Sequence, residues 1–418
     1  MSTVEVHVEL AGKAVFTGVL FSHLRRGREG TTFRYEPGYF NHAGAYALES
    51  AMPLVSGDFA FQQGLPRSFC DASPDRWGRN LIEKGLRQQW ADTGQQPRTI
   101  TEMDYLLGVS DFSRQGALRF RQSGSRQFAA LGEEVPKLIA LPKLLAASNR
   151  LCSAKEQSEG TLEAVKTLLG AGTGSLGGAR PKATVIDTEK AGQGMLHIAK
   201  FPHPNDKWDV MRWEKIALDL AADAGITVPE NRLITVEDAN ILLLKRFDRS
   251  DDGERIGYMS AMTLLESEEG ESGDYLDIAD SLTEISGSTS EDLAELWRRL
   301  IFSLLINNTD DHLRNHAVLR SGAAWRLSPA FDLNPNPGIN DRRVTSIQGA
   351  TTFEAGWTAA NEAHEWFGLS EAAARDVRGR VFDAVRGWER RAIKHGATKA
   401  ELELFRPVLE RAYGYIAR

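Results

Sequence analysis

Short apolar segments with the periodicity of strands open the chain. Residues 4–9 alternate valines with polar side chains, which is the pattern of a half-buried β-strand. A glycine and a lysine separate them from a second apolar run, so we expect a β-hairpin. The strands predicted in this part of the chain are 4–9, 14–16, 31–35 and 116–120. They indicate a small, mostly antiparallel sheet, accompanied by a helix over 75–90.

The pattern then changes to mixed strands and helices, and finally to helices. Apolar residues at helical spacing predict helices over 162–169 and 209–224, and Gly225 ends the second of these. The strands predicted around them are 182–186, 195–201, 231–236 and 240–247. From about residue 280 the pattern is helical, apart from β-rich patches at 317–319 and 325–327. The expected fold class is therefore α+β, with a polar domain boundary at 122–125.

Composition narrows the function classes. The 418 residues are 42% hydrophobic and carry a net charge of −7, from 50 basic and 57 acidic residues. A dedicated nucleic-acid binder usually presents a basic face, which makes that class less favoured. No apolar run approaches the roughly 18–20 residues that span a bilayer, and the first residues do not resemble a signal peptide. We therefore expect a cytoplasmic protein without a membrane segment.

A glycine-rich motif lies between a predicted helix and a predicted strand. Residues 172–177 read Gly-Thr-Gly-Ser-Leu-Gly, and such a loop lets backbone N–H groups approach phosphate oxygens. Dinucleotide-binding units have a strand before the glycines and a helix after them, and a Walker A motif is also absent. A kinase glycine loop, with Gly177 and Gly178 near the nucleotide, fits better. A flexible linker is the alternative. A phosphate on Ser175 would repel the nucleotide phosphates.

Two later strands carry residues that kinases use to hold a nucleotide. Lys200 lies at the end of strand 195–201, where a lysine is costly to bury unless it is paired. Kinases place one there to hold the α/β-phosphates, paired with a glutamate on the following helix, which here is Glu214. The alternative is an edge-strand lysine with its ammonium group in water. Strand 240–247 leads through Lys245 to Phe247 into a polar segment, where the backbone of a kinase meets adenine.

A dense polar loop follows the apolar helix face at 297–305. Asp310 and Asn315 are five residues apart in this loop, which is the spacing of kinase catalytic loops. The aspartate would accept the proton of the substrate hydroxyl, and the asparagine carbonyl would bind Mg²⁺. His312 and Arg314 add donors that could orient a carboxylate or a phosphate. A surface turn capped by Asp and Asn is the alternative.

A downstream aspartate completes the expected metal site. Asp332 is predicted to end a strand, and Mg²⁺ favours one or two protein carboxylates together with phosphate oxygens. Each feature alone fits a simpler explanation. Their occurrence together, in kinase order, is much rarer by chance and predicts an ATP- and Mg²⁺-dependent kinase. The set is the glycine loop, Lys200, Glu214, Asp310, Asn315 and Asp332.

Longer motifs surround these residues. They are Ser175-Leu-Gly-Gly-Ala-Arg-Pro-Lys182, His197-Ile-Ala-Lys200, Lys245-Arg-Phe-Asp-Arg249, Asn308-Thr-Asp-Asp-His-Leu-Arg-Asn315 and Leu327-Ser-Pro-Ala-Phe-Asp332. With segments 69–79 and 107–119, they make nearly the whole chain resemble the HipA family of bacterial toxin kinases. The resemblance implies a protein-kinase-like fold in three parts. These are a β-rich N-terminal subdomain at 1–122, a mixed N-lobe with the glycine loop at 123–247, and a helical C-lobe with the catalytic and metal-binding loops at 248–418.

The resemblance also implies roles for single residues. Asp310 would be the catalytic base, Asn315 and Asp332 would bind Mg²⁺, and the backbone of 245–247 would hold adenine. Ser175 matches the family's autophosphorylated serine, whose modification is expected to expel the glycine loop and switch the enzyme off. Family members phosphorylate protein serine, in known cases on an aminoacyl-tRNA synthetase. A helix-turn-helix, HipB-like antitoxin neutralises them and makes the DNA contacts.

Two other functions stay open from the sequence. One is a catalytically weak kinase-like scaffold that acts as a co-repressor with a DNA-binding antitoxin. The other is a small-molecule kinase that uses the same centre. The intact set of Asp310, Asn315 and Asp332 favours an active serine/threonine protein kinase, because a scaffold has no need for all three.

Overall fold

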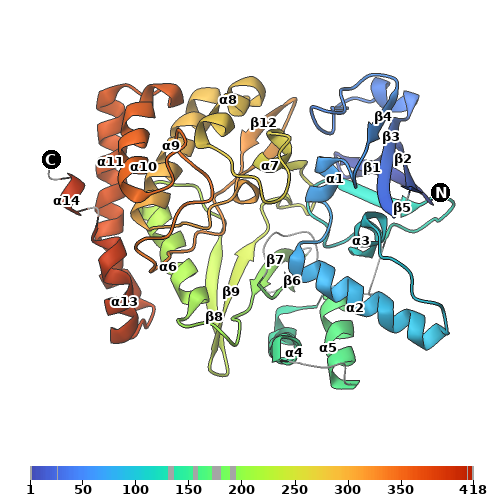
Figure 1. Cartoon of the computed structure of the whole chain (residues 1–418), viewed down its shortest axis with the longest axis horizontal. Coiled ribbons are helices and arrows are strands. Elements are labelled where there is room, and N and C mark those ends of the chain that lie inside the picture. The colour runs from blue at the N-terminus through green and yellow to red at the C-terminus, as the bar shows by residue number, and fades with distance from the viewer. Residues whose placement is uncertain are drawn as a thin grey trace. The chain divides into compact units, whose positions relative to one another are not determined.

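The computed structural model divides the chain into two compact units (Figure 1). Unit 1 comprises Met1–Asn205 and Thr235–Met259, and unit 2 comprises Asp206–Ile234 and Ser260–Arg418. The residues that the structure describes are 2–25, 27–129, 136–153, 159–171, 180–188, 194–411 and 413–416. The three domains expected from the sequence, with boundaries at 122 and 247, stay a prediction.

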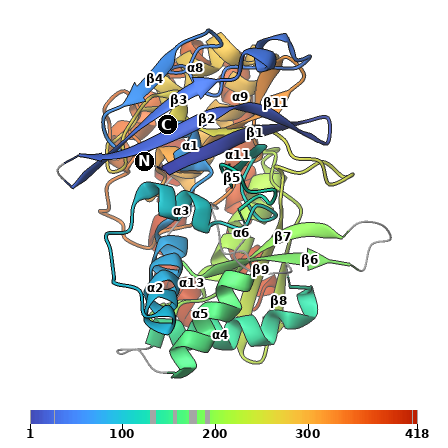
Figure 2. The ribbon, with the colours of Figure 1, turned by 90° about the vertical axis from the view of Figure 1, so that its right-hand side faces the viewer.

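An antiparallel five-stranded sheet forms the first part of unit 1 (Figure 2). Its order is β4-β3-β2-β1-β5, and every neighbouring pair is antiparallel. The strands are β1 (Ser2–Leu10), β2 (Lys13–Arg25), β3 (Arg28–Tyr35), β4 (Asp58–Phe61) and β5 (Leu118–Gln122). The predicted hairpin and the small antiparallel sheet are therefore confirmed.

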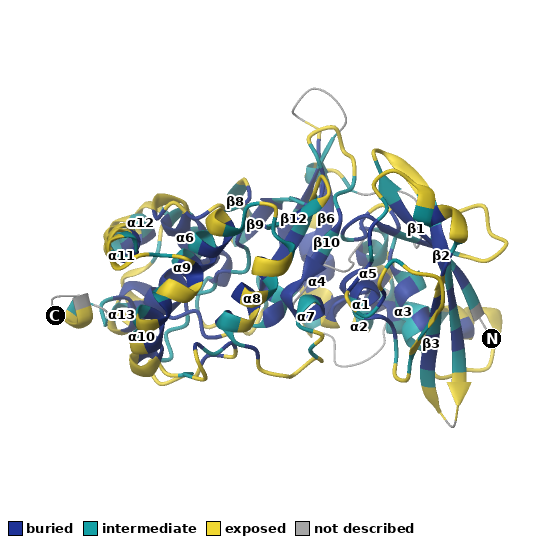
Figure 3. Cartoon of the chain, turned by 90° about the horizontal axis from the view of Figure 1, so that it is seen from above, coloured by how far each residue is buried: buried dark blue, intermediate teal, exposed yellow. Residues whose placement is uncertain are grey.

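The alternation of apolar residues places one face of this sheet against a core (Figure 3). The valines at 4, 6 and 8 on β1 are fully buried, because successive side chains of a strand point to opposite faces. Phe33 on β3 and Phe120 on β5 are buried as well, and the Phe69 ring contacts both edge-on at 5.5 and 5.2 Å between centroids. Phe69 belongs to α1 (Arg67–Asp71), so this helix packs on the buried face.

Helices and a second sheet complete unit 1. Asp75 caps α2 by accepting a hydrogen bond from the Gly78 amide, and Gly94 ends the helix in the left-handed conformation. The second sheet places β7 between β6 and β9, all antiparallel. The elements are α2 (Arg76–Thr93), α3 (Glu102–Gly108), α4 (Leu141–Ser153), α5 (Glu159–Gly170), β6 (Lys182–Asp187), β7 (Met195–Lys200) and β9 (Ala239–Lys245). Strands β8 (Asn231–Val236) and β10 (Tyr258–Ser260) include two of the three points where the chain passes from one unit to the other, and the third follows Asn205.

Unit 2 is mainly helical and is built around a buried helix, α9 (Thr289–Leu305). The predicted apolar face is confirmed, since Trp297, Leu300 and Ile301 are fully buried and the Trp297 indole donates to the Ala360 carbonyl at 3.0 Å. The other helices are α6 (Val210–Asp223), α7 (Ala261–Leu264), α8 (Tyr275–Ile285), α10 (Phe353–Glu362), α11 (Glu371–Arg386), α12 (Trp388–Lys394), α13 (Lys399–Leu409) and α14 (Tyr413–Ile416). A hairpin of β11 (Ala317–Ser321) and β12 (Ala324–Leu327) follows α9. Among the described residues, no helix combines the length and apolarity needed to cross a bilayer.

A buried histidine on β1 should make the stability of unit 1 depend on pH. The His7 ring lies 5.2 Å from the rings of Phe16 and Phe128, between centroids. Burial, aided by Arg121, lowers the pKa of His7 from 6.5 to about 4. The folded state therefore stays neutral where the unfolded state binds a proton, so the free energy of unfolding falls as the pH drops. We expect a loss of about 2 kcal/mol between pH 7 and 4.5 from this group, measured by urea unfolding.

The variant His7→Phe keeps the ring contacts and removes the titrating group. Its free energy of unfolding should change less than that of the unmodified chain over the same pH range. The control His42→Phe alters an exposed histidine and should keep the full pH dependence. An unchanged pH dependence in His7→Phe would contradict this assignment.

Candidate active site

The loop predicted to carry the chemistry begins directly after α9. The helix ends at Leu305, and Asn307 takes a left-handed backbone conformation at φ +54°, which asparagine tolerates better than most residues. The side-chain amide of Asn307 donates to the backbone carbonyls of Asn336 (2.6 Å) and Gly338 (3.1 Å). The chain therefore turns sharply out of a buried helix, and the turn is fixed by hydrogen bonds to a distant segment.

Asp310 and Asn315 lie together in this loop. The side-chain nitrogen of Asn315 donates to the backbone carbonyl of Asp310 at 3.2 Å. That hydrogen bond uses the nitrogen of the amide, so the carbonyl oxygen is the atom suited to coordinate Mg²⁺. Asp310 is exposed, whereas Thr309 and Asp311 on either side of it are buried. The loop thus presents one carboxylate outward from a rigid support.

His312 and Arg314 have different surroundings from those expected. The His312 backbone amide donates to the Asp310 carbonyl at 3.2 Å, and its imidazole Nδ1 finds no partner within the described chain. Arg314 forms a long 3.5 Å pair with Glu269, whose side chain is mostly exposed. The predicted roles of these two residues toward a carboxylate or phosphate stay predictions.

Asp311 is a buried, hydrogen-bonded residue of this loop whose contacts the sequence did not reveal. Its carboxylate accepts hydrogen bonds from the hydroxyls of Tyr275 and Ser303 (3.0 Å for Ser303), and from the Arg343 guanidinium at 3.0 Å. The His316 imidazole lies 3.0 Å from its other oxygen. Burial opposes ionisation of Asp311, but His316 and Arg343 hold its pKa well below the usual range. A buried anion therefore connects four separate segments of unit 2.

The segment around Arg343 runs alongside the loop at 308–315. The Arg343 guanidinium also donates to the Asn308 carbonyl at 3.3 Å. The amides of Val344 and Thr345 donate to the carbonyls at 309 and 311, at 3.0 and 3.2 Å. These backbone contacts hold the loop on both sides of Asp310, so its carboxylate has a fixed base.

The expectation that Asp332 ends a strand is wrong. Strand β12 ends at Leu327, and Asp332 lies in an irregular segment with a left-handed backbone at φ +57°. Pro329 has no N–H to continue the ladder, and the Ala330 amide donates to the Thr227 carbonyl at 2.8 Å instead. The side-chain amide of Asn334 donates to the Asp332 carboxylate at 3.1 Å. Asp332 therefore sits on a turn fixed by local contacts, which is a suitable support for a metal-binding carboxylate.

Lys200 and Lys245, two of the residues predicted to hold the nucleotide, belong to unit 1. Lys200 ends β7, which is an inner strand, and its side chain is buried, so the alternative of an edge-strand lysine in water is wrong. Glu214 is buried on α6 of unit 2, and its pairing with Lys200 stays a prediction. Lys245 ends β9 and pairs with Asp251 at 2.7 Å. Ser175, Gly177 and Gly178 lie outside the described residues.

A buried ion pair lies beside Lys200. Lys182 on β6 is paired with Lys200 on β7 in the sheet register, so the two cationic residues lie side by side on the same face of the sheet. The Lys182 ammonium binds the Asp75 carboxylate at 2.7 Å, and both side chains are less than 5% exposed. Asp75 is also the cap of α2, so one carboxylate joins that helix to the beginning of β6. It offsets a charge that would otherwise be buried without a partner.

The fold is that of a protein-kinase-like α+β class. The solved structure of HipA from Shewanella oneidensis MR-1, in a complex with HipB and operator DNA, superposes with a TM-score of 0.67. The match covers 99% of this chain and 98% of that one at 13% sequence identity. The model of the HipA-like C-terminal domain matches residues 174–388, more than half of the 418 residues. The chain belongs to the HipA family, which confirms the resemblance and the predicted fold class.

Two curated proteins of Sinorhizobium fredii share part of the sequence. The "Putative kinase Y4dM" is 30% identical over 183 residues, and Y4mE, which has the same designation, is 26% identical over 182 residues. Each match covers 38% of this chain. The matched segments make up 44% and 41% of those relatives, so the chain spans less than half of their length.

The hydrogen bonds and ion pairs of Asp311 should contribute a large part of the stability of unit 2. The variant Asp311→Asn leaves Arg343 buried without its anion, and we expect the free energy of unfolding to fall by about 3 kcal/mol. The folded-state pKa of Asp311 is depressed, so its contribution is complete above the unfolded value of 3.8 and is lost as the pH falls further. Urea unfolding at pH 7 and pH 3 measures both effects, and the difference between variant and unmodified chain should shrink at pH 3.

Asp277→Asn is the matched control for this experiment. Asp277 is exposed on α8, the helix that also carries Tyr275. Its replacement should change the free energy of unfolding by less than about 0.5 kcal/mol. Equal stability of Asp311→Asn and Asp277→Asn at pH 7 would show that the buried network contributes nothing.

Proposed function

We propose that this chain is an ATP- and Mg²⁺-dependent serine/threonine protein kinase that acts as the toxin of a toxin–antitoxin pair. The observation that carries the proposal is the exposed Asp310 carboxylate on a buried loop, with the Asn315 amide bound to its backbone. A catalytic base needs such a fixed position, since small displacements are costly to the rate. Membership of the HipA family supports the same chemistry.

Each residue then has one role in phosphoryl transfer. The oxygen of the substrate hydroxyl attacks the γ-phosphorus of ATP, and ADP leaves. Asp310 accepts the proton that the hydroxyl releases. Lys200 holds the phosphates, while the backbone of residues 245–247 holds adenine. The oxygens of Asn315 and Asp332 suit Mg²⁺, which prefers oxygen ligands and, when bound, neutralises charge on the transferred phosphoryl group.

The proposal includes regulation and partners. Gly177 and Gly178 would approach the phosphates, and Ser175 would be the autophosphorylated serine, as the family resemblance implies. HipA from S. oneidensis was solved with HipB and operator DNA, which supports a HipB-like antitoxin here. The net charge of −7 agrees with DNA contact only through that antitoxin. The substrate would be a translation-related protein in the cytoplasm, with an aminoacyl-tRNA synthetase as the first candidate.

Labelled ATP gives a direct test of the chemistry. The purified full chain, incubated with labelled ATP and Mg²⁺, should place phosphate on Ser175. The variants Asp310→Ala and Asp332→Ala should lower the labelling rate by about 10²–10⁴-fold, because they remove the proton acceptor or a metal ligand. Ser175→Ala should lose this label while it retains transfer to an added protein substrate.

Controls separate this function from the alternatives. Asp277→Asn, an exposed aspartate of the same unit, should label as the unmodified chain does. No transfer with Mg²⁺ or Mn²⁺ would contradict a kinase. ATP consumption with a metabolite mixture, without protein labelling, would identify a small-molecule kinase. A growth effect that survives Asp310→Ala would identify a co-repressor scaffold.

A further inference from the structure

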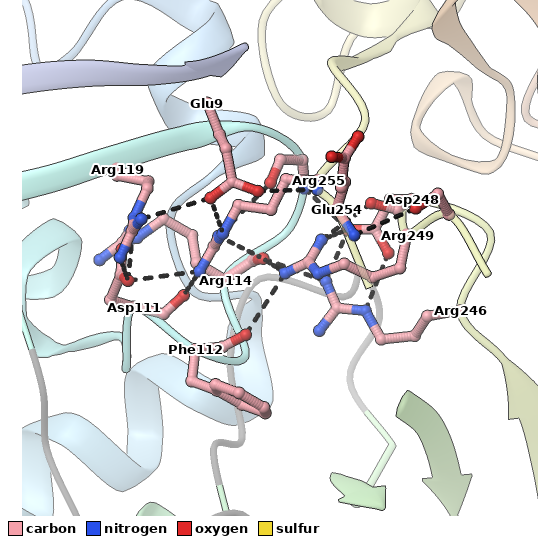
Figure 4. Close-up of polar contacts among 12 residues, drawn as sticks. Glu9, Asp111, Phe112, Arg114, Arg119, Arg246, Asp248, Arg249, Glu254 and Arg255 are labelled. Atoms are coloured by element: carbon pink, nitrogen blue, oxygen red, sulfur yellow. Dashed lines mark hydrogen bonds and ion pairs between the residues drawn. The ribbon is translucent and has the colours of Figure 1, made fainter. Parts of the chain in front are cut away.

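Unit 1 contains a buried charge network that the proposed chemistry does not use (Figure 4). It lies where residues 246–255, which follow β9, meet a loop at 111–116, which precedes β5. We call residues 111–116 the clamped loop, and residues 245–247 the hinge segment. Arg246, the middle residue of the hinge segment, is 2% exposed although its side chain is long and cationic. A buried guanidinium needs acceptors, and these come from the clamped loop.

Arginines after β9 bind the backbone carbonyls of the clamped loop. The Arg246 guanidinium donates to the carbonyls of Ser113 and Arg114, the latter at 3.1 Å. Arg249 donates to the carbonyls of Arg114 at 2.8 Å and Phe112 at 3.3 Å. Figure 4 shows these guanidinium groups side by side, pointing into the loop. Two neighbouring side chains thus bind the carbonyl oxygens of three consecutive residues.

A single carboxylate joins the arginines to each other and to the loop. Asp248 accepts from Arg246 at 2.6 and 2.9 Å and from Arg249 at 2.8 Å. The same carboxylate accepts from the Gly116 amide at 2.8 Å. Burial opposes its ionisation, but the two arginines hold the pKa of Asp248 well below the usual range. Gly116 has φ +72°, and a Cβ there would lie 3.0 Å from the Tyr258 side chain, so the loop position is closely fitted.

Further ion pairs extend the network to the first strand. The backbone amide of Arg255 donates to the Glu9 carboxylate at 2.9 Å, and its guanidinium lies 3.4 Å from the same residue. Arg119 pairs with Asp111 at 2.6 Å and with Glu9 at 3.3 Å. The five-stranded sheet and the residues after β9 are therefore connected through charges rather than apolar packing alone. A network of this kind permits one arrangement and resists small shifts.

The geometry points to a positioning role for this network in nucleotide binding. We propose that the clamped loop, through Arg246 and Asp248, fixes the backbone of the hinge segment and so sets the affinity for the adenine nucleotide. The Arg246 amide already donates to the Leu196 carbonyl at 3.0 Å, so its backbone is held by β7 and its side chain by the clamped loop. The inference rests on the proposed role of residues 245–247 in adenine binding. The N-terminal sheet would then act on ATP affinity without touching ATP.

The test separates nucleotide affinity from the chemical step. In the full chain, Asp248→Asn removes the charge between the two arginines and loosens the hinge segment. We expect the Kd for a non-hydrolysable ATP analogue with Mg²⁺, measured by calorimetry, to rise by about ten-fold. The KM for ATP should rise similarly, while kcat at saturating ATP stays within about two-fold. A merely structural defect would lower the folded fraction and kcat and leave the KM of the remaining enzyme unchanged.

A milder variant and a matched control complete the experiment. Arg249→Lys keeps a cation beside Asp248 but loses the carbonyl contacts, so it should raise the Kd by less and serves if Asp248→Asn does not fold. Asp252→Asn alters an exposed side chain in the same segment, and should leave the Kd unchanged. Wild-type affinity in folded Asp248→Asn or Arg249→Lys would overturn this inference alone. Absence of nucleotide binding by the unmodified chain would overturn the proposed function and this inference with it.

Discussion

The Asp311 carboxylate lies buried among a guanidinium, an imidazole and two hydroxyl groups, and the conformation of the loop at 308–315 depends on this contact. A loop without regular structure has few backbone hydrogen bonds of its own. Here one anion draws donors from four segments, and the backbone amides of Val344 and Thr345 add further contacts to the loop. Its neighbour Asp310 faces outward, so adjacent acidic residues have opposite tasks. The inner one fixes the backbone, and the outer one is the carboxylate that the proposed chemistry uses.

Unit 1 also contains a buried carboxylate that is held between basic side chains. Asp248 is buried between Arg246 and Arg249, as Asp311 is between Arg343 and His316. In both cases burial alone would favour the neutral acid, and the adjacent basic side chains reverse that preference. Buried ion pairs add little net stability compared with apolar packing, but losing one partner is costly. Such centres therefore favour a single arrangement of the chain around them.

The sequence was informative wherever a signal is local. The alternation at 4–9 and the apolar face at 297–305 each predict an element that the structure contains. The five-residue spacing of Asp310 and Asn315 identified two residues that share a hydrogen bond, from the Asn315 side chain to the Asp310 backbone carbonyl. The expectation that Asp332 ends a strand failed because Pro329 ends the ladder after β12 and tertiary contacts set the path of the residues that follow. A local pattern gives no sign of which distant donors will meet a carboxylate, so the networks of Asp248 and Asp311 could not be anticipated.

Arg246 and Arg249 contact the clamped loop through its peptide groups. Arg246 and Arg249 bind carbonyl oxygens at 112–114, and every amino acid offers the same oxygen. The side chain of Phe112 is half exposed and takes no part in these contacts. Evolution is therefore free to change the identity of such a residue, while an insertion or deletion would shift every carbonyl out of register. Among relatives, position 112 should vary in composition while the loop keeps a constant length.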